Sequence, residues 1–256
     1  MTLLDVQRLT KSFGGLVANK DISFAVAQGE LLGVIGPNGA GKTTLFNSIA
    51  GAHRIDSGKV IFDGRDITAL KSHQVARLGL TRTFQIYAAS GDLTVKENVM
   101  VGCFMKTGSR SVAAARADRI LQEFEIEHLA RSAVGELPIA AQKRVVMATA
   151  MGTEPKLLLL DEVAAGLTPH EVDGIIATIR FIHKDLGVTV ILIEHVMEMV
   201  MNVCHRVLVL DYGEKIAEGQ PREVVKDPGV IKAYLGERYA REHAAGTDVL
   251  SEHAKP

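Results

Sequence analysis

The segment at residues 36–44 constrains the fold of this chain more than any other. It follows the apolar run Leu31–Ile35 and precedes a helix-like stretch at residues 45–50. A polyphosphate needs several backbone N–H groups converging on it, and glycine allows a close approach because it has no Cβ. The segment matches G-x-x-x-x-G-K-[ST] and reads Gly36, Pro37, Asn38, Gly39, Ala40, Gly41, Lys42, Thr43 and Thr44. It predicts a strand, a phosphate-binding loop and a helix in that order.

Each chemical part of a phosphate site has a candidate in this segment. The N-terminus of the following helix supplies N–H groups and the positive end of the helix dipole. Lys42 can reach the β and γ phosphates of a nucleotide, and the Thr43 hydroxyl can ligate magnesium. A glycine-rich turn without this function would match the pattern in about one random chain in a hundred of this length, and far less often between a strand and a helix. We therefore expect residues 36–44 to bind phosphate.

A second candidate site is the pair Asp161 and Glu162, which directly follows the apolar residues 157–160. In an open parallel sheet, ligands bind at the carboxyl ends of the strands. Asp161 can hold magnesium through water, and Glu162 can orient or deprotonate an attacking water. In isolation, this sequence fits a strand followed by a solvated acidic turn equally well. The phosphate loop elsewhere in the chain favours the functional interpretation.

Short apolar runs alternate with segments of helical period, an order typical of a parallel sheet flanked by helices. The runs Leu31–Ile35, 157–160 and 188–193 are apolar apart from Thr189 and show no polar alternation, which predicts strands buried on both faces. The first 30 residues and residues 59–63 instead predict a more antiparallel layer, because turn signals separate them. The expected fold class is therefore α/β with an additional antiparallel β layer.

Between about residues 86 and 154 the pattern becomes almost wholly helical, which predicts a helical lobe inserted in the α/β core. Capping boxes at Thr94 and Thr168 predict helix starts, and residues 111–130 carry apolar side chains at helical spacing. Residues 237–256 are polar and lack clear periodicity, so we expect them to form a frayed tail.

The composition disfavours several other functions. Lys and Arg number 29 against 30 Asp and Glu, and a net charge of −1 gives no field for a phosphate backbone, so we expect no nucleic-acid partner. No apolar run approaches the roughly 18 residues that span a bilayer, and the N-terminus lacks a signal segment, so we expect a cytosolic chain. Cys103 and Cys204 lack metal-ligand spacing, which predicts inert, reduced thiols.

With these motifs together, the chain resembles the nucleotide-binding subunits of ABC transporters. Gln85 stands at the entry to the helical lobe, where such subunits carry a glutamine loop. His195 follows the run at residues 188–193, where they carry a switch histidine, and Phe13 precedes a Gly-Gly pair, where they place an aromatic ring on adenine. Individually, a Gln is usually solvated, a His structural and a Phe part of a core. Their order around the two stronger motifs favours the joint interpretation.

The resemblance covers roughly residues 3–236 and implies an ABC-type domain with a RecA-like P-loop NTPase core over residues 1–236. It implies that ATP binds with its adenine on Phe13 and its phosphates on residues 36–44. The implied magnesium ligands are Thr43, Gln85 and Asp161. The implied catalytic residues are Glu162, His195 and Gln85. The lobe at residues 86–154 would receive a transmembrane permease.

Within that family, the chain is most similar to the paired ATPase subunits of branched-chain amino-acid importers. The similarity lies in TRTFQ at 81–85, LTVKENVMVG at 93–102, AAGLTP at 164–169, IEHVMEMV at 193–200 and AEGQPREVVKDPGVIKAYLGE at 217–237. It implies a peripheral subunit on the cytoplasmic face of the inner membrane that hydrolyses ATP to drive import. Its partners would be a second ATPase subunit, permease subunits and, indirectly, a periplasmic solute-binding protein. Amides, urea or another small solute remain alternatives, because an ATPase subunit never touches the transported molecule.

One family motif is eroded in this chain. Residues 137–144 read LPIAAQKR and align with the LSGGQ-type signature, which binds ATP held on the partner subunit. Pro138 replaces a hydroxyl, Ile139 and Ala140 replace glycines, and Ala141 replaces an amide. The β-branched Ile139 stands where a phosphate should meet bare N–H groups. We expect the fold to survive and the chain to need a different partner with an intact signature.

Other functions compete with an ATP-hydrolysing transport subunit. A regulatory subunit could bind ATP while only its partner turns over, although the intact Glu162 and His195 favour hydrolysis. A soluble ABC protein acting on ribosomes or DNA usually has two ATPase modules or a long coiled coil, and neither occurs here. A G protein is disfavoured because the chain lacks an Asn-Lys-x-Asp segment.

Overall fold

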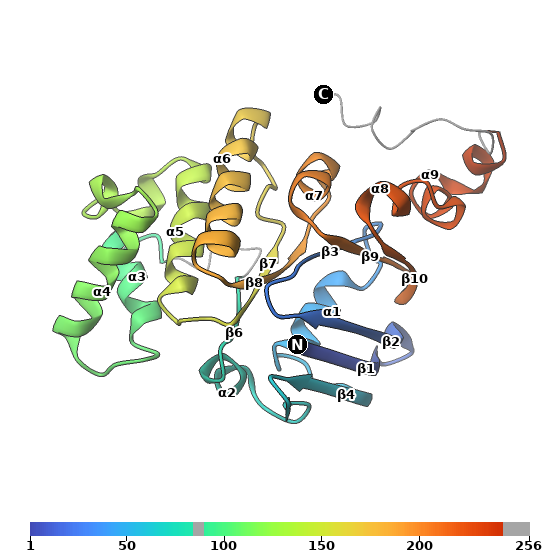
Figure 1. The fold of residues 1–256 in the computed structure, drawn as a ribbon, viewed down its shortest axis with the longest axis horizontal. Helices are drawn as coiled ribbons and strands as arrows, with labels where there is room; N and C mark the ends of the chain where they lie inside the picture. The colour runs from blue at the N-terminus through green and yellow to red at the C-terminus, as the bar shows by residue number, and fades with distance from the viewer. Residues whose placement is uncertain (84–89, 243–256) are drawn as a thin grey trace. The chain divides into compact units, whose positions relative to one another are not determined.

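The chain divides into two compact units. A computed structural model describes residues 1–83 and 90–242, with side chains as far as Leu235. The first unit comprises Met1–Ser72 and Thr189–Pro256, and the second comprises His73–Val188. Figure 1 labels the elements of both units.

An antiparallel sheet in the first unit confirms the layer predicted from the first 30 residues and residues 59–63. Its order is β2-β1-β4-β5, formed by β1 (Thr2–Phe13), β2 (Leu16–Ala27), β4 (Ser57–Phe62) and β5 (Arg65–Asp66). Leu4, Val6 and Leu9 on β1 are buried. The alternation of buried and exposed residues along β1 is interrupted at Arg8. Arg8 has a positive φ of 49°, and the pairing register with β2 shifts between Val6 and Leu9. This shift matches a β-bulge, which adds twist to the sheet.

The parallel strands of the first unit are buried as predicted. β3 (Leu31–Ile35) pairs in parallel with β8 (Thr189–Ile193) on one side and β9 (Arg206–Asp211) on the other. β10 (Glu214–Gly219) closes this edge as an antiparallel partner of β9. Every residue of β3 and β8 is buried, because their side chains on both faces lie beneath other elements.

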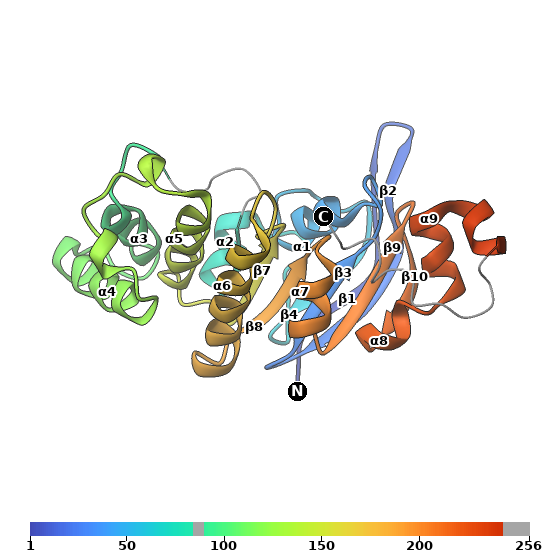
Figure 2. The ribbon, with the colours of Figure 1, turned by 90° about the horizontal axis from the view of Figure 1, so that it is seen from above.

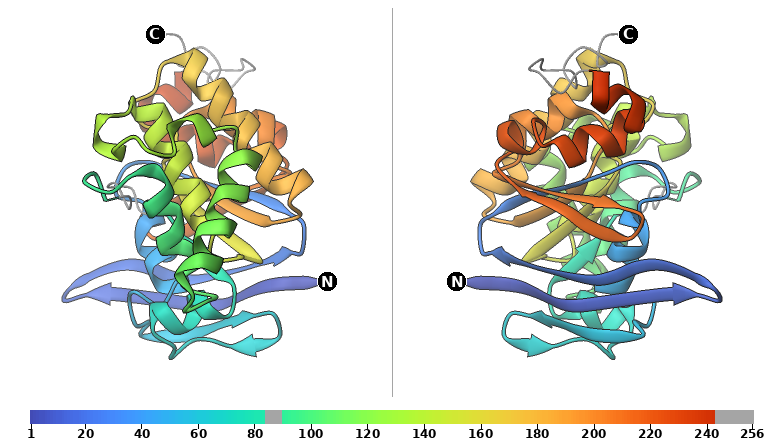
Figure 3. Two further views of the ribbon diagram at one scale, coloured as in Figure 1. Left: turned by 90° about the vertical axis from the view of Figure 1, so that its left-hand side faces the viewer. Right: turned by 90° about the vertical axis from the view of Figure 1, so that its right-hand side faces the viewer.

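Helices cover both faces of these strands within the first unit (Figures 1 and 3). α1 (Lys42–Ile49) lies between β3 and the antiparallel sheet, whereas α7 (Met197–Val203), α8 (Pro221–Val224) and α9 (Pro228–Glu242) lie on the opposite face. α9 continues to Glu242, so the frayed tail predicted from residue 237 is wrong for its first six residues. Ala, Arg and Glu in this stretch are good helix formers, and a helix can therefore continue without apolar periodicity.

The second unit contains the predicted helical segment. β6 (Leu80–Arg82) pairs in parallel with β7 (Leu157–Asp161). Figure 2 shows α5 between α3 and α6. The helices are α2 (Ser72–Arg77), α3 (Val95–Cys103), α4 (Arg110–Glu123), α5 (Ile139–Met151) and α6 (Pro169–Arg180), with short helical turns at Glu127–Leu129, Val134–Glu136 and Phe181–Asp185.

The local signals that predicted these helices are confirmed, with one exception. Thr94 and Thr168 each form a complete capping box. The helix expected over residues 111–130 ends at Glu123, because Glu125 adopts a left-handed φ of 55° that cannot continue an α-helix. Periodicity of apolar residues does not reveal such a backbone reversal.

Candidate nucleotide-binding site

The phosphate loop leaves β3 after Ile35 and enters α1 at Lys42. Its glycines have positive φ values: 148° at Gly36, 80° at Gly39 and 96° at Gly41. A Cβ on Gly36 would lie 2.1 Å from the Leu210 carbonyl oxygen, and one on Gly41 would lie 2.2 Å from the Ala18 carbonyl oxygen. A Cβ on Gly39 would meet no atom within 4 Å. Gly36 and Gly41 are therefore required by the strands behind the loop, and the open side of the loop is at Gly39.

The N-terminus of α1 has the properties of an anion site. Gly41 is its N-cap, and no side-chain hydrogen bond caps the helix, so the positive end of the helix dipole lies at the phosphate loop. The Lys42 ammonium is buried and donates hydrogen bonds to the carbonyl oxygens of Gly36, at 2.7 Å, and Pro37, at 2.9 Å. The cation is thus held over the loop, where a polyphosphate would find both charge and backbone donors. These residues fit a nucleotide phosphate chain.

Thr43 and Thr44 occupy the first turn of α1 and are half-buried. The Thr43 hydroxyl is a hard oxygen donor of the kind that magnesium prefers. Its predicted role as a magnesium ligand remains a prediction.

Phe13 lies at the end of β1 with 45 % of its surface exposed. The Lys11 ammonium lies 4.9 Å from the ring centroid, and His53 packs edge-on at 5.2 Å. The Phe13 ring is therefore fixed by its contacts with Lys11 and His53, is accessible to solvent, and is not part of the core. This placement suits the predicted contact with adenine.

Asp161 ends β7 and forms a buried ion pair that sequence reasoning missed. Its Oδ2 accepts a hydrogen bond of 2.7 Å from Arg82 Nη2, and the two side chains are 0 % and 5 % exposed respectively. Arg82 ends the neighbouring strand β6, three residues before Gln85. A charged residue at the end of an otherwise uncharged strand was the signal that could have identified it, because a buried cation needs an anionic partner.

Glu162 begins the turn after β7 with a left-handed φ of 49°. For a residue other than glycine this conformation costs roughly 1–2 kcal/mol, and such strain often accompanies functional sites. The carbonyl oxygen of Glu162 accepts a hydrogen bond of 3.1 Å from Lys143 Nζ on α5. Within the second unit, the structure therefore links the acidic turn directly to the helix that carries the eroded signature.

Two further residues, His195 and Gln85, were predicted to take part in the nucleotide site. His195 follows β8, is exposed, and donates its backbone N–H to the Glu194 carboxylate at 3.3 Å. Glu194 itself is 1 % exposed. Gln85 lies outside the described residues. The roles assigned to His195 and Gln85 from the family pattern remain predictions.

The segment that we align with the signature, residues 137–144, spans the start of α5, so the helix predicted there is confirmed, while its assignment as a signature remains a prediction. Pro138 is the N-cap and makes no side-chain capping bond, and Ile139 is the first helical residue, with 41 % of its surface exposed. The Gln142 side chain donates to the Leu137 carbonyl oxygen at 2.8 Å. An exposed isoleucine side chain therefore stands at a helix N-terminus, where an anion would need open backbone N–H groups.

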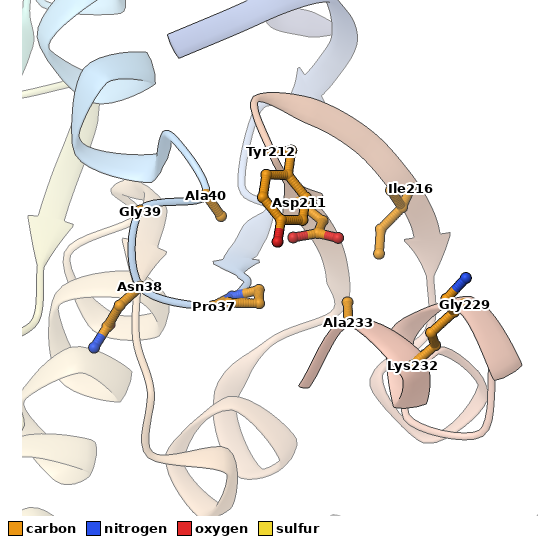
Figure 4. Close-up of a pocket in the computed structure, with 10 residues that line it drawn as sticks. All are labelled: Pro37, Asn38, Gly39, Ala40, Asp211, Tyr212, Ile216, Gly229, Lys232 and Ala233. Carbon is orange, nitrogen blue, oxygen red and sulfur yellow. The ribbon is translucent and has the colours of Figure 1, made fainter. Parts of the chain in front are cut away.

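A pocket of 610 Å³ borders the phosphate loop on the side of the C-terminal helix (Figure 4). Figure 4 shows Asp211, the last residue of β9, and Tyr212, in the turn that follows, projecting between the loop and α9. The lining residues are Pro37, Asn38, Gly39, Ala40, Asp211, Tyr212, Ile216, Gly229, Lys232 and Ala233. Residues of the C-terminal segment thus line one side of the pocket next to the phosphate loop.

The two cysteines have the character predicted for inert thiols. Cys103 is buried and Cys204 half-buried, and burial raises the pKa of both thiols. A raised pKa reduces the population of the reactive thiolate at neutral pH.

A glycine loop between a buried strand and an uncapped helix, with a lysine held over it, defines a P-loop nucleotide-binding protein. The family model described as ABC transporter matches residues 19–165, and the model described as branched-chain amino acid ATP-binding cassette transporter matches residues 214–240. This chain belongs to the ABC transporter ATP-binding family. The recognition and fold class predicted from the sequence are therefore confirmed.

Individual relatives match over nearly the whole chain. It is 37 % identical over 250 residues to the high-affinity branched-chain amino acid transport ATP-binding protein BraF of Pseudomonas aeruginosa, covering 92 % of this chain and 98 % of that protein. It is 36 % identical over 253 residues to the corresponding LivG protein of Escherichia coli K12, with the same coverage. The crystal structure of the ADP conformation of MJ1267, an ATP-binding cassette of an ABC transporter, superposes with a TM-score of 0.84 at 31 % identity, covering 93 % of this chain and 100 % of that one.

Family membership defines the general activity. ABC ATPases of transporters bind and hydrolyse nucleotide, dimerise, and work with membrane permeases. Among the described residues, no helix is both long and apolar enough to cross a membrane.

Proposed function

We propose that this chain is the ATP-hydrolysing subunit of an importer for branched-chain amino acids. One observation carries the proposal: the phosphate loop of an ABC ATPase shares this chain with a C-terminal segment, residues 214–240, that matches the branched-chain amino acid transporter model. The names of the relatives BraF and LivG support the same solute class.

The chemistry follows from the residues described above. Lys42 and the N–H groups of α1 would bind the β and γ phosphates, and Phe13 would stack on adenine. Thr43 directly and Asp161 through water would hold magnesium, with Gln85 as a third ligand. A magnesium ion held there would supply positive charge to the phosphates. Glu162 would orient and deprotonate the attacking water, and His195 would contact the γ-phosphate.

The eroded signature supports an asymmetric heterodimer. Each composite site of an ABC dimer would combine one subunit's phosphate loop with the other subunit's signature. This chain carries an intact loop, but Pro138 and Ile139 stand where its partner's ATP would need a hydroxyl and bare N–H groups. The site on this chain's own loop would turn over with a partner's signature, whereas the partner's site would bind ATP and turn over slowly.

The assembly would lie on the cytoplasmic face of the inner membrane. The helical lobe would receive the permease, which would connect this chain indirectly to a periplasmic solute-binding protein. Exposed apolar side chains on the lobe, at Val101, Phe104 and Met105, support a contact there. Crosslinks from a permease should map to residues near 86–104, and crosslinks confined to the segment after residue 237 would refute this placement.

Binding and transport can be tested separately. In calorimetry with magnesium and ATP, Lys42→Ala should weaken binding by about 1.5–3 kcal/mol, the range for a hydrogen bond to a charged group. Equal affinity for both forms would exclude phosphate binding by Lys42. Uptake assays on the reconstituted transporter, using leucine, urea and an amide in parallel, would then identify the solute. Uptake of only urea or the amide would refute the amino-acid assignment.

The asymmetry has its own test. Rebuilding the signature with Pro138→Ser, Ile139→Gly, Ala140→Gly and Ala141→Gln should raise hydrolysis at the partner's site. The partner's site can be isolated by Glu162→Gln in this chain, which silences this chain's own site. The purified chain alone should be monomeric and nearly inactive. An ATP-dependent homodimer with robust turnover would contradict the proposed defect.

A further inference from the structure

Asn19 on β2 is a fully buried polar residue behind the phosphate loop. Its exposure is 0 %, and its Nδ2 donates a hydrogen bond of 3.0 Å to the carbonyl oxygen of Gly41. The Oδ1 of the same amide is buried with no hydrogen-bond partner in the described part of the chain. Burying an unsatisfied oxygen is unfavourable, and an apolar side chain would avoid it. The hydrogen bond from Nδ2 to Gly41 must therefore contribute enough to offset the free-energy cost of burying the unpaired Oδ1.

The Gly41 carbonyl determines the direction of an N–H group that faces the ligand. In a planar trans peptide the C=O and the following N–H point in opposite directions. A donor holding the Gly41 oxygen from behind therefore turns the Lys42 N–H toward the open side of the loop. The helix bond from the Leu45 N–H to the same oxygen, at 2.9 Å, acts in the same sense but is internal to α1. Asn19 adds a contact from outside the helix.

A second contact holds the preceding peptide in the same way. The Gly213 N–H, in the turn between β9 and β10, donates to the Ala40 carbonyl oxygen at 3.1 Å, which directs the Gly41 N–H away from that turn. The fit is tight on this side, because a Cβ on Gly213 would lie 2.7 Å from the Ala18 carbonyl oxygen. A strand and a turn from distant parts of the sequence thus hold consecutive peptides of one glycine-containing loop.

Glycine makes such external support necessary. Gly41 has a φ of 96° and lacks the Cβ that would restrict its rotation, so the loop itself does not define its peptide orientations. A phosphate site gains affinity when its donors are oriented before the ligand arrives. We infer that Asn19 is a positioning residue for the phosphate loop, which presents the Lys42 backbone N–H to the β-phosphate of a bound nucleoside polyphosphate. The inference rests on the nucleotide binding proposed above.

The test compares two variants of the full chain that each lose one buried side-chain hydrogen bond to the backbone. Asn19→Leu removes the contact to Gly41. Thr189→Val is the matched control: Thr189 is also 0 % exposed in the first unit, and its hydroxyl accepts a 2.9 Å hydrogen bond from the Gly29 N–H, away from the loop. ATP affinity is measured by calorimetry, and stability by thermal unfolding without nucleotide.

Asn19→Leu should raise the Kd for ATP about tenfold, equivalent to about 1.4 kcal/mol. Thr189→Val should leave the Kd within about twofold of wild type, even where both variants unfold at a lower temperature. A folded Asn19→Leu protein with wild-type affinity would overturn the inference, as would an equal loss in Thr189→Val. If Asn19→Leu does not fold, Asn19→Ala removes the same donor with a smaller side chain and carries the same expectation. Failure of the wild-type chain to bind ATP would instead refute the proposed function.

Discussion

The buried ion pair between Arg82 and Asp161 yields a quantitative prediction for the second unit. Arg82→Met removes the guanidinium but retains most of the side-chain volume. The Asp161 carboxylate, 0 % exposed, would then lose the cation at 2.7 Å from its Oδ2. Removing one partner of a buried pair typically costs about 3–5 kcal/mol, because the remaining charge stays desolvated. With both side chains so deeply buried, solvent screening does not reduce this value.

A double-mutant cycle tests whether the cost comes from the charge or from packing. Arg82→Met, Asp161→Leu and the double variant are compared with wild type by urea denaturation. The double variant should be more stable than Arg82→Met, since replacing both charges with apolar side chains is often neutral or stabilising. The coupling energy of the pair should therefore be on the order of 3 kcal/mol, within the range measured for residues in contact.

A half-exposed pair in the same unit provides the control. Lys96 Nζ lies 2.7 Å from Asp118 Oδ1, with side chains 34 % and 51 % exposed. Lys96→Met should cost less than about 1 kcal/mol, as exposed ion pairs do. If Arg82→Met cost no more than Lys96→Met, or if the single-variant costs simply added in the double variant, the electrostatic explanation would be refuted.

Two further predictions concern catalysis and acid stability. Glu162→Gln should leave ATP binding intact but slow hydrolysis by about 10²- to 10⁴-fold, the usual contribution of a general base; wild-type turnover in the assembled transporter would show that Glu162 is structural. Hydrogen bonds from the backbone and side chain of Thr168 lower the pKa of Glu171 in its capping box. Its stabilising effect should therefore be complete above the unfolded value of about 4.3 and be lost as the pH falls through the lower folded pKa. Glu171→Gln should thus destabilise the protein at pH 7 but not in strong acid, measured by unfolding at each pH; a pH-independent difference would contradict this.

Much of the fold could be predicted from the sequence, because the signals are contiguous. The phosphate loop lies between its strand and its helix within 20 residues, from Leu31 to Ile49. The buried strands are recognisable because nearly all their residues are apolar. The capping boxes at Thr94 and Thr168 each lie within four residues. In each case the residues that interact are neighbours in the chain, so spacing alone identifies the structure.

The tertiary structure alone decided which distant residues support the site. Arg82 and Asp161 are 79 positions apart, and Asn19 and Gly41 are 22 apart. In the sequence, each is a single polar residue with no indication of its partner. Pairing of β6 with β7 and close packing of β2 behind the loop bring them together. The sequence by itself determined the phosphate loop and the family, whereas only the folded chain showed how that loop is held, because burial and hydrogen bonding of a polar group depend on strands that meet only in three dimensions.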